Sequence, residues 1–203
     1  MNDINKEHWE NVYATKNPDQ VSWTQKEPQT SLDFIHSFGL GKNASIIDIG
    51  GGDSNLVDYL LEEGYENITV LDISAKALER ARKRLGEKGD KITWITSDIT
   101  AFEPRETYDI WHDRAAFHFL TTPQQVSQYI KTAGKCVTGF IILGTFSKEG
   151  PAKCSGLDIQ QYDSESLPAK FEADFEKIKC LTENHITPFG TVQNFVFCSF
   201  KKT

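Results

Sequence analysis

Glycines and acidic residues follow two short apolar runs of this 203-residue chain, in a spacing that can hold a nucleoside. The stretch Asp48-Ile49-Gly50-Gly51-Gly52 comes after Ile46 and Ile47, and a second apolar run, 68–71, ends at Asp72. A buried strand that leads into a glycine turn and a helix, followed by a strand tipped with a carboxylate, holds the adenosine part of a cofactor in many α/β folds. Asp72 is then placed to accept hydrogen bonds from ribose hydroxyls.

The glycine pattern distinguishes between cofactors. A dinucleotide fingerprint has a third glycine where this chain has Asn55. Asp53 adds a negative charge beside the start of the next helix, where phosphate oxygens would lie. The pattern therefore favours S-adenosylmethionine, which has an adenosine and a zwitterionic amino-acid tail but no phosphate. The alternative is a tight turn that needs glycine for positive φ and holds no ligand.

Composition excludes several function classes. A net charge of −7 and a pI near 5.3 argue against a nucleic-acid binder. The N-terminus lacks the apolar core of a secretory signal, and no segment is apolar enough to span a bilayer. We therefore expect a cytoplasmic protein with neither nucleic-acid nor membrane partners.

The cysteines and histidines predict no metal. Four widely spaced cysteines, without Cys-x-x-Cys, indicate buried apolar residues or free thiols rather than a zinc site or a disulfide scaffold. These are Cys136, Cys154, Cys180 and Cys198. The five histidines include no helix-spaced pair of metal ligands.

Helices and strands alternate along the chain, without repeats or low-complexity linkers. Strands are expected at residues 46–49, 68–72, 92–95, 108–111, 140–143, 175–182 and 192–200. This alternation predicts an α/β fold with a doubly wound, Rossmann-like sheet that is mostly parallel and binds ligands at the carboxyl ends of its strands. The closing pair of strands, joined without a helix, predicts an antiparallel edge. We expect one domain, 1–203, with an N-terminal lid or substrate segment, 1–30, before a Rossmann-like core, 31–203.

A third strand end adds to the predicted cofactor site. Asp98 is placed to accept a hydrogen bond from the exocyclic amine of adenine, and Ile99 to contact the ring. Taken alone, Asp98 is equally an ordinary loop acid or helix cap. Ile73, next to Asp72, completes the expected cofactor contacts.

With these motifs the chain resembles the class I S-adenosylmethionine-dependent methyltransferases over nearly its whole length. The family's Asp-x-Gly-x-Gly stands at 48–52, its ribose-binding acid is Asp72 and its adenine-proximal acid is Asp98. The resemblance implies a seven-stranded sheet with the last strand inserted antiparallel. Further segments are similar to a bacterial group related to the citrate synthase-lysine and elongation-factor-lysine methyltransferases of eukaryotes. They are 8–13, 21–23, 109–119, 153–157 and 185–188.

Aromatic residues near the N-terminus admit two interpretations. Trp9, Tyr13 and Trp23 can form a lid whose rings face the sulfonium and exclude water, with Trp23 on the cofactor and Tyr13 toward the acceptor. Alternatively, Trp9 and Tyr13, four residues apart, are the apolar face of a leading helix.

The segment after the fourth strand is the expected chemical site. An amine acceptor must arrive unprotonated, and Asp113, facing the methyl group with Trp23 across the pocket, is the candidate that orients it or takes its proton. The alternatives are a structural Asp113–Arg114 ion pair and a His112 that caps a sheet end. Where eukaryotic relatives often have Asp-Lys-Gly, this chain has Asp113-Arg114-Ala115.

Three further residues are candidates for the acceptor pocket. They are Arg114, His118 and Cys154. His118 lies in an apolar run and is alternatively packed in the core. Cys154 is either a pocket wall or a nucleophile paired with His185 or His112.

The sequence thus predicts a monomeric S-adenosylmethionine-dependent methyltransferase that uses no metal. Its expected acceptor is a protein lysine amine, followed by a small molecule. An NAD-binding oxidoreductase and a non-catalytic adenosine-binding module are the alternatives from other classes.

Overall fold

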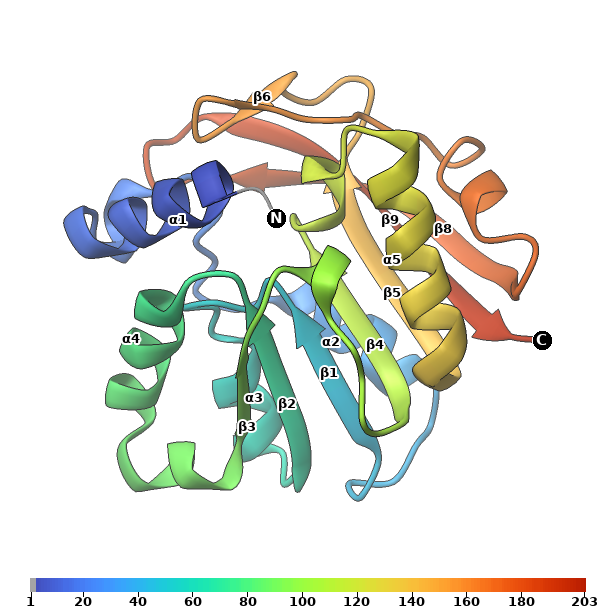
Figure 1. The fold of residues 1–203 in the computed structure, drawn as a ribbon, viewed down its shortest axis with the longest axis horizontal. Helices are drawn as coiled ribbons and strands as arrows, with labels where there is room; N and C mark the ends of the chain where they lie inside the picture. The colour runs from blue at the N-terminus through green and yellow to red at the C-terminus, as the bar shows by residue number, and fades with distance from the viewer. Residues whose placement is uncertain (1–2) are drawn as a thin grey trace.

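The computed structural model describes residues 3–203, and a twisted seven-stranded sheet runs through them (Figure 1). Its strand order is β3-β2-β1-β4-β5-β9-β8. The strands are β1 (Ser45–Ile49), β2 (Asn67–Asp72), β3 (Thr93–Thr96), β4 (Tyr108–Arg114), β5 (Val137–Phe146), β8 (Phe175–Ile186) and β9 (Val192–Lys202). A separate small hairpin joins β6 (Lys153–Cys154) to β7 (Leu157–Asp158).

The strand directions confirm the predicted fold class. Strands β3, β2, β1, β4 and β5 pair in parallel, and β9 pairs antiparallel with both β5 and β8. The order reverses at β1, because β2 and β4 lie on its two sides. In a doubly wound sheet, ligands bind at the carboxyl ends of the strands near this reversal.

Strand β4 is longer than the sequence predicted. It was expected to end at Trp111, but it continues to Arg114. Asp113 pairs with Ile49 of β1 on one side and with Leu143 of β5 on the other. Residues 112–114 therefore belong to the strand, and their side chains must alternate between its two faces.

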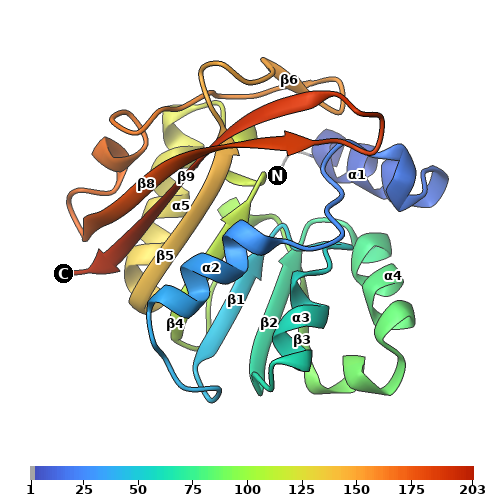
Figure 2. The same ribbon diagram turned by 180° about the vertical axis from the view of Figure 1, so that it is seen from behind.

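Five α-helices accompany the sheet within residues 3–203. They are α1 (Asp3–Thr15), α2 (Gln29–Ser37), α3 (Leu56–Glu62), α4 (Ala75–Leu85) and α5 (Pro123–Cys136). Sequence signals set two of the starts: Ser74 Oγ accepts from Ala77 N–H at 3.2 Å, and Thr122 forms a capping box with Gln125. Helix α5 covers the face of β4 and β5 seen in Figure 1, and α2 covers the opposite face, seen in Figure 2.

Each face of the sheet has its own apolar core. Trp111 and Ile141 belong to the core that includes Tyr129 of α5. Ile110 and Ile142, one residue away in the same strands, belong to the core that includes α2. This alternation along β4 and β5 gives the sheet two buried faces, as expected of a mainly parallel sheet.

The prediction for two of the cysteines was wrong. Cys180 and Cys198 were expected as buried residues or free thiols, but they form a disulfide. The β8–β9 register places them directly opposite each other, with their Cα atoms 4.1 Å apart. Cys136 and Cys154 are free and buried, as predicted. No helix within residues 3–203 combines the length and the apolar character needed to cross a bilayer.

Helix α1 lies beyond the carboxyl ends of the strands (Figure 1). It contacts α4, and hydrogen bonds join the two helices at two separate places. The Glu10 carboxylate accepts hydrogen bonds from Ser74 Oγ, Ala75 N and Lys76 N, at 3.1, 2.8 and 3.2 Å. In the other direction, Arg80 of α4 donates through Nη1 to the carbonyl oxygen of Lys16, at 2.8 Å. An anion thus meets the free N–H groups at the start of α4, and a cation meets the last carbonyls of α1.

We expect Glu10→Ala to loosen α1 from the sheet while leaving the core folded. Loss of a capping carboxylate costs about 1 kcal/mol, which raises the population of the detached helix roughly fivefold. The measurement is limited trypsin digestion, with cleavage within residues 1–30 followed by mass spectrometry. Glu7→Ala, at an exposed position on the same helix, is the control. Equal cleavage rates in the two variants would show that Glu10 does not hold α1.

Candidate functional site

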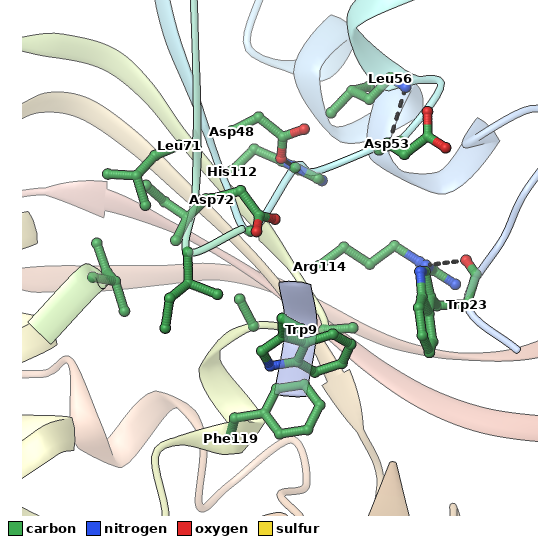
Figure 3. A pocket seen from close by; sticks show the side chains of 18 of the residues that line it. Trp9, Trp23, Asp48, Asp53, Leu56, Leu71, Asp72, His112, Arg114 and Phe119 are labelled. Carbon is green, nitrogen blue, oxygen red and sulfur yellow. Dashed lines mark hydrogen bonds and ion pairs between the residues drawn. The ribbon is translucent and has the colours of Figure 1, made fainter. Parts of the chain in front are cut away.

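A cavity of about 250 Å³ opens at the carboxyl ends of β1, β2 and β4, beneath α1 (Figure 3). The structure brings most of the predicted site residues to its wall. They are Asp48, Gly50, Gly51, Asp72, Ile73, Asp98, Ile99, Trp23, Tyr13, Arg114 and Cys154. Gly52, Asp113 and His118 do not line it. Residues that sequence reasoning missed include Ser31, Phe119, Arg80 and Arg84.

The glycine turn needs its glycines for two reasons. Gly50 and Gly52 have φ values of 65° and 46°, which side chains disfavour. A Cβ atom at Gly51 would lie 2.5 Å from Asp48 Oδ2, and one at Gly52 would lie 2.8 Å from Asp72 Oδ2. The absence of side chains therefore lets the backbone pass close to both carboxylates. Gly52 does not line the cavity itself, but its lack of a side chain leaves room for the Asp72 carboxylate, which does.

Asp48 is held by a buried chain of hydrogen bonds. His112 Nδ1 donates to Asp48 Oδ1 at 2.7 Å, and Ser31 Oγ lies 2.8 Å from His112 Nε2. With Nδ1 as the donor, Nε2 accepts from the Ser31 hydroxyl, which fixes the tautomer of the ring. All three residues line the cavity and are at most 3% exposed. His112, predicted as a sheet-end cap, instead orients a carboxylate.

Asp72 is a buried carboxylate without a cationic partner within hydrogen-bond distance among residues 3–203. Its Oδ1 accepts from Ser74 N–H at 2.8 Å. Burial raises the pKa of Asp72 to about 7, and the nearby charges of Asp48 and Glu10 act in the same direction. A ligand that donates hydrogen bonds or carries positive charge would favour the ionised form.

Asp98 and Ile99 lie on the cavity wall and also shape it. Asp98 Oδ1 accepts from the Thr100 N–H at 2.8 Å and from the Thr100 hydroxyl at 2.7 Å, which caps the short helix Ile99–Ala101. Those bonds use only one of the two carboxylate oxygens. Leu71 and Leu120 line the cavity as well, so this part of its wall is mainly apolar.

The two arginines of α4 at the cavity are already neutralised. Arg80 pairs with Asp53 at 3.2 Å, and Arg84 pairs with both Asp53 and Asp58. These guanidinium groups are therefore not free to balance a phosphate. Asp53 is neutralised by the same contacts, so the repulsion of phosphate by its charge stays a prediction.

Aromatic rings from the N-terminal segment cover the cavity. The ring of Trp9 lies 5.5 Å from that of Trp23 and 5.2 Å from that of Phe119, both edge to face. Tyr13 lies 6.3 Å from Trp23. Trp9 and Tyr13 lie on one face of a helix, as one of the two interpretations predicted, and both side chains line the cavity. Figure 3 shows Trp9 at the cavity.

Asp113 does not occupy its predicted position. Its Oδ1 accepts from the N–H groups of Ala116 and Phe117, at 3.0 and 3.1 Å, and its Oδ2 accepts from the Tyr129 hydroxyl at 2.8 Å. Burial raises the pKa of Asp113 to about 6 against these donors. Because side chains alternate along β4, residues 112 and 114 face the cavity while 111 and 113 face α5. The alternative ion pair with Arg114 is not formed either.

Arg114 extends from the end of β4 toward the N-terminal segment. Its Nη1 donates to the carbonyl oxygen of Trp23 at 3.0 Å, and its guanidinium carbon lies 4.7 Å from the centre of the Phe195 ring (Figure 3). Burial lowers the pKa of Arg114 to about 10, so the group is charged at neutral pH.

His118 and Cys154 have packing roles. His118 is fully buried, stacks on Phe146 with ring centres 4.7 Å apart, and has its pKa lowered to about 3 by burial. Cys154 is a wall of the cavity whose pKa burial raises to about 12, so it is not a thiolate. Its proposed partner His185 donates instead to the carbonyl oxygen of Ser22, at 2.7 Å. Across residues 3–203 no three His, Cys, Asp or Glu side chains are grouped as metal ligands would be.

Comparison with known proteins agrees with this geometry. Residues 46–139 match the family described as methyltransferase domain. The eEF1A lysine and N-terminal methyltransferase of Mus musculus is 21% identical over 120 residues, covering 59% of this chain and 17% of that protein. The malonyl-[acyl-carrier protein] O-methyltransferase 2 of Ilyobacter polytropus is 26% identical over 106 residues, covering 52% and 40%. The chain therefore spans less than half the length of either relative.

A solved structure extends the likeness to the whole fold. The N-methyltransferase NodS from Bradyrhizobium japonicum WM9, in complex with S-adenosyl-L-homocysteine, superposes with a TM-score of 0.73 at 16% identity and covers 97% of both chains. Taken together, these comparisons show that residues 46–139 match a methyltransferase domain and that the whole chain has the fold of a methyltransferase crystallised with S-adenosyl-L-homocysteine.

Proposed function

We propose that the protein transfers a methyl group from S-adenosylmethionine to a nitrogen nucleophile of its acceptor. The observation that carries the proposal is the pair of buried carboxylates, Asp48 and Asp72, on either side of the glycine turn and beneath aromatic rings. A cofactor with two cationic centres and a ribose matches those groups in charge and in hydrogen bonding.

The protein contributes binding, orientation and exclusion of water. When bound, S-adenosylmethionine supplies a methyl group on a sulfonium, which is already an electrophile. Asp72 would hold the ribose hydroxyls, and Ile99 and Leu71 the adenine. Trp9, Trp23 and Phe119 keep water out, and the faces of their rings favour positive charge. Positioning of this kind supplies most of the acceleration in a displacement at carbon.

A protein lysine is the first candidate acceptor. The mouse relative is named for methylation of lysine in eEF1A. The tip of the β8–β9 hairpin carries exposed apolar side chains, Ile186, Phe189 and Val192, which are 69%, 57% and 60% exposed. Next to this tip, His185 is bonded to the lid segment at Ser22. An apolar surface beside the lid is suited to a protein that presents a side chain to the cavity.

A small molecule is the second candidate, and Arg114 favours it. A guanidinium at the cavity wall disfavours a second cation, so an ammonium would have to lose its proton on entry. A neutral or anionic acceptor meets no such barrier. Other relatives and neighbours, such as the O-methyltransferase of Ilyobacter polytropus, are named for different acceptors.

The proposed function predicts selective binding and methyl transfer. S-Adenosylhomocysteine should raise the melting temperature, and NAD should leave it unchanged, because stabilisation follows binding to the folded state. Incubation of cell extract with enzyme and methyl-labelled cofactor should place the label in protein if lysine is the acceptor, and in small molecules otherwise. Stabilisation by NAD alone would support the oxidoreductase alternative. Binding without any transfer would support the non-catalytic module.

Asp72→Asn should weaken binding of S-adenosylhomocysteine and, above neutral pH, raise the stability of the ligand-free protein. The folded pKa of about 7 lies above the usual value of 3.8, so ionisation of Asp72 destabilises the ligand-free protein as pH rises from about 4 to 7. The variant should therefore melt higher than wild type at pH 8, yet bind S-adenosylhomocysteine about 1.5–3 kcal/mol more weakly. Wild-type affinity should fall below pH 7, whereas that of the variant should change little. Calorimetry at pH 6, 7 and 8 measures both; equal pH profiles would contradict ribose binding by Asp72.

Asp113→Asn should act on stability rather than on chemistry. The carboxylate accepts from two N–H groups and from Tyr129, and an amide cannot accept the phenol proton at its nitrogen. We expect the free energy of unfolding to fall by about 1–3 kcal/mol, with the single-turnover rate per folded molecule within about threefold of wild type. A loss of roughly a hundredfold in a folded variant would restore Asp113 as a general base.

A further inference from the structure

The charged groups around the cavity differ in the ion pairs and hydrogen bonds that they form. Arg80 and Arg84 are both paired with Asp53. Asp48 is held by His112 and accepts at Oδ1. Arg114 is the arginine of the cavity wall that forms no ion pair within residues 3–203.

The charge of Arg114 is only partly balanced by its surroundings. The nearby charge of Glu183 on β8 acts to raise the pKa of Arg114 against the effect of burial, but the two side chains form no ion pair within residues 3–203, and Glu183 Oε2 is itself buried without a hydrogen-bond partner there. The carbonyl of Trp23 takes one hydrogen bond from Nη1, while Nε and Nη2 are buried without a hydrogen-bond partner in the part of the chain that the structure describes. The Phe195 ring lies against the guanidinium and offers only its π face. A buried cation left in this state is costly, and an anion that enters the cavity would relieve the cost.

The register of the sheet indicates which anion this is. Asp48 of β1 pairs with His112 of β4, and Arg114 follows two residues later on the same face of β4. The backbone positions of Asp48 and Arg114 are thus roughly 8 Å apart, diagonally across two neighbouring strands, and no ion pair joins their side chains. An α-amino acid carries an ammonium and a carboxylate on one carbon, and such a zwitterion fits between an anion and a cation placed this way.

We propose that Arg114 binds the carboxylate of the amino-acid tail of S-adenosylmethionine, opposite an Asp48 that His112 and Ser31 orient toward the ammonium. This assignment rests on the proposed function and adds a second anchor to it. Asp72 holds the ribose end of the cofactor, and Arg114 holds the other end. The hydrogen bond to Trp23 makes the anchor part of the lid, so binding of the tail and closure of residues 21–25 are linked.

The test compares two ligands that differ only in the carboxylate. Calorimetry with S-adenosylhomocysteine and with its decarboxylated form measures what that group contributes. Wild type should bind S-adenosylhomocysteine at least tenfold more tightly, which corresponds to about 1.4 kcal/mol. Arg114→Met should lose this preference while keeping its affinity for the decarboxylated ligand. Arg105→Met, at an exposed position in the loop before β4, is the matched control and should behave as wild type.

Each contrary result has its own meaning. If wild type binds both ligands equally, or if Arg114→Met keeps the preference, Arg114 does not bind the carboxylate. Normal cofactor affinity with slow methyl transfer in Arg114→Met would assign the arginine to the acceptor and overturn the proposal. The wild-type comparison decides the matter even if Arg114→Met does not fold. Failure of wild type to bind either ligand would instead contradict the proposed function.

Discussion

Burial of like charges is the constraint on which the site depends. Asp48 and Asp72 stand at the ends of adjacent strands, both at most 5% exposed, and no cation in the described part of the chain is paired with Asp72. Burial and the charge of Asp48 both raise the pKa of Asp72. The protein stabilises them with oriented donors instead: His112 for one and the Ser74 N–H for the other. The site is therefore prepared for a cation before any ligand arrives, at a cost in stability.

The lid follows from the same electrostatics. Glu10, a third carboxylate, raises the pKa of Asp72 yet is held by the free N–H groups of α4. The start of α4 thus stabilises the Glu10 carboxylate and fixes α1, which carries Trp9 and Tyr13 over the cavity. The contact between Glu10 and α4 therefore caps α4, holds α1 over the cavity and adds to the negative potential within the cavity.

Sequence periodicity located the strand ends, but it did not show for every strand which side chains lie on which face of the sheet. Asp72 and Ser74 were predictable because an apolar run, a carboxylate and a capping serine follow in order. The position of Asp113 was not predictable, because both faces of β4 are buried and the run 108–111 does not show which of residues 112 and 113 faces the cavity. The link between Glu10 and α4 spans 64 residues or more, and the pairing of Cys180 with Cys198 depends on a hairpin register with a bulge at 177–179. Neither leaves a local pattern.

Arg114 connects the cofactor to the choice of acceptor. As a buried cation without an ion pair in the described residues it disfavours an ammonium, and this is the physical argument for a small-molecule acceptor. If the carboxylate of the cofactor neutralises it, that repulsion is removed as soon as the cofactor is bound. The aromatic rings of Trp9, Trp23 and Phe119 would then dominate the environment of the incoming nitrogen, and they favour rather than oppose a lysine side chain. The acceptor class therefore depends on how Arg114 is neutralised, and an order of binding with cofactor first follows from the same charge.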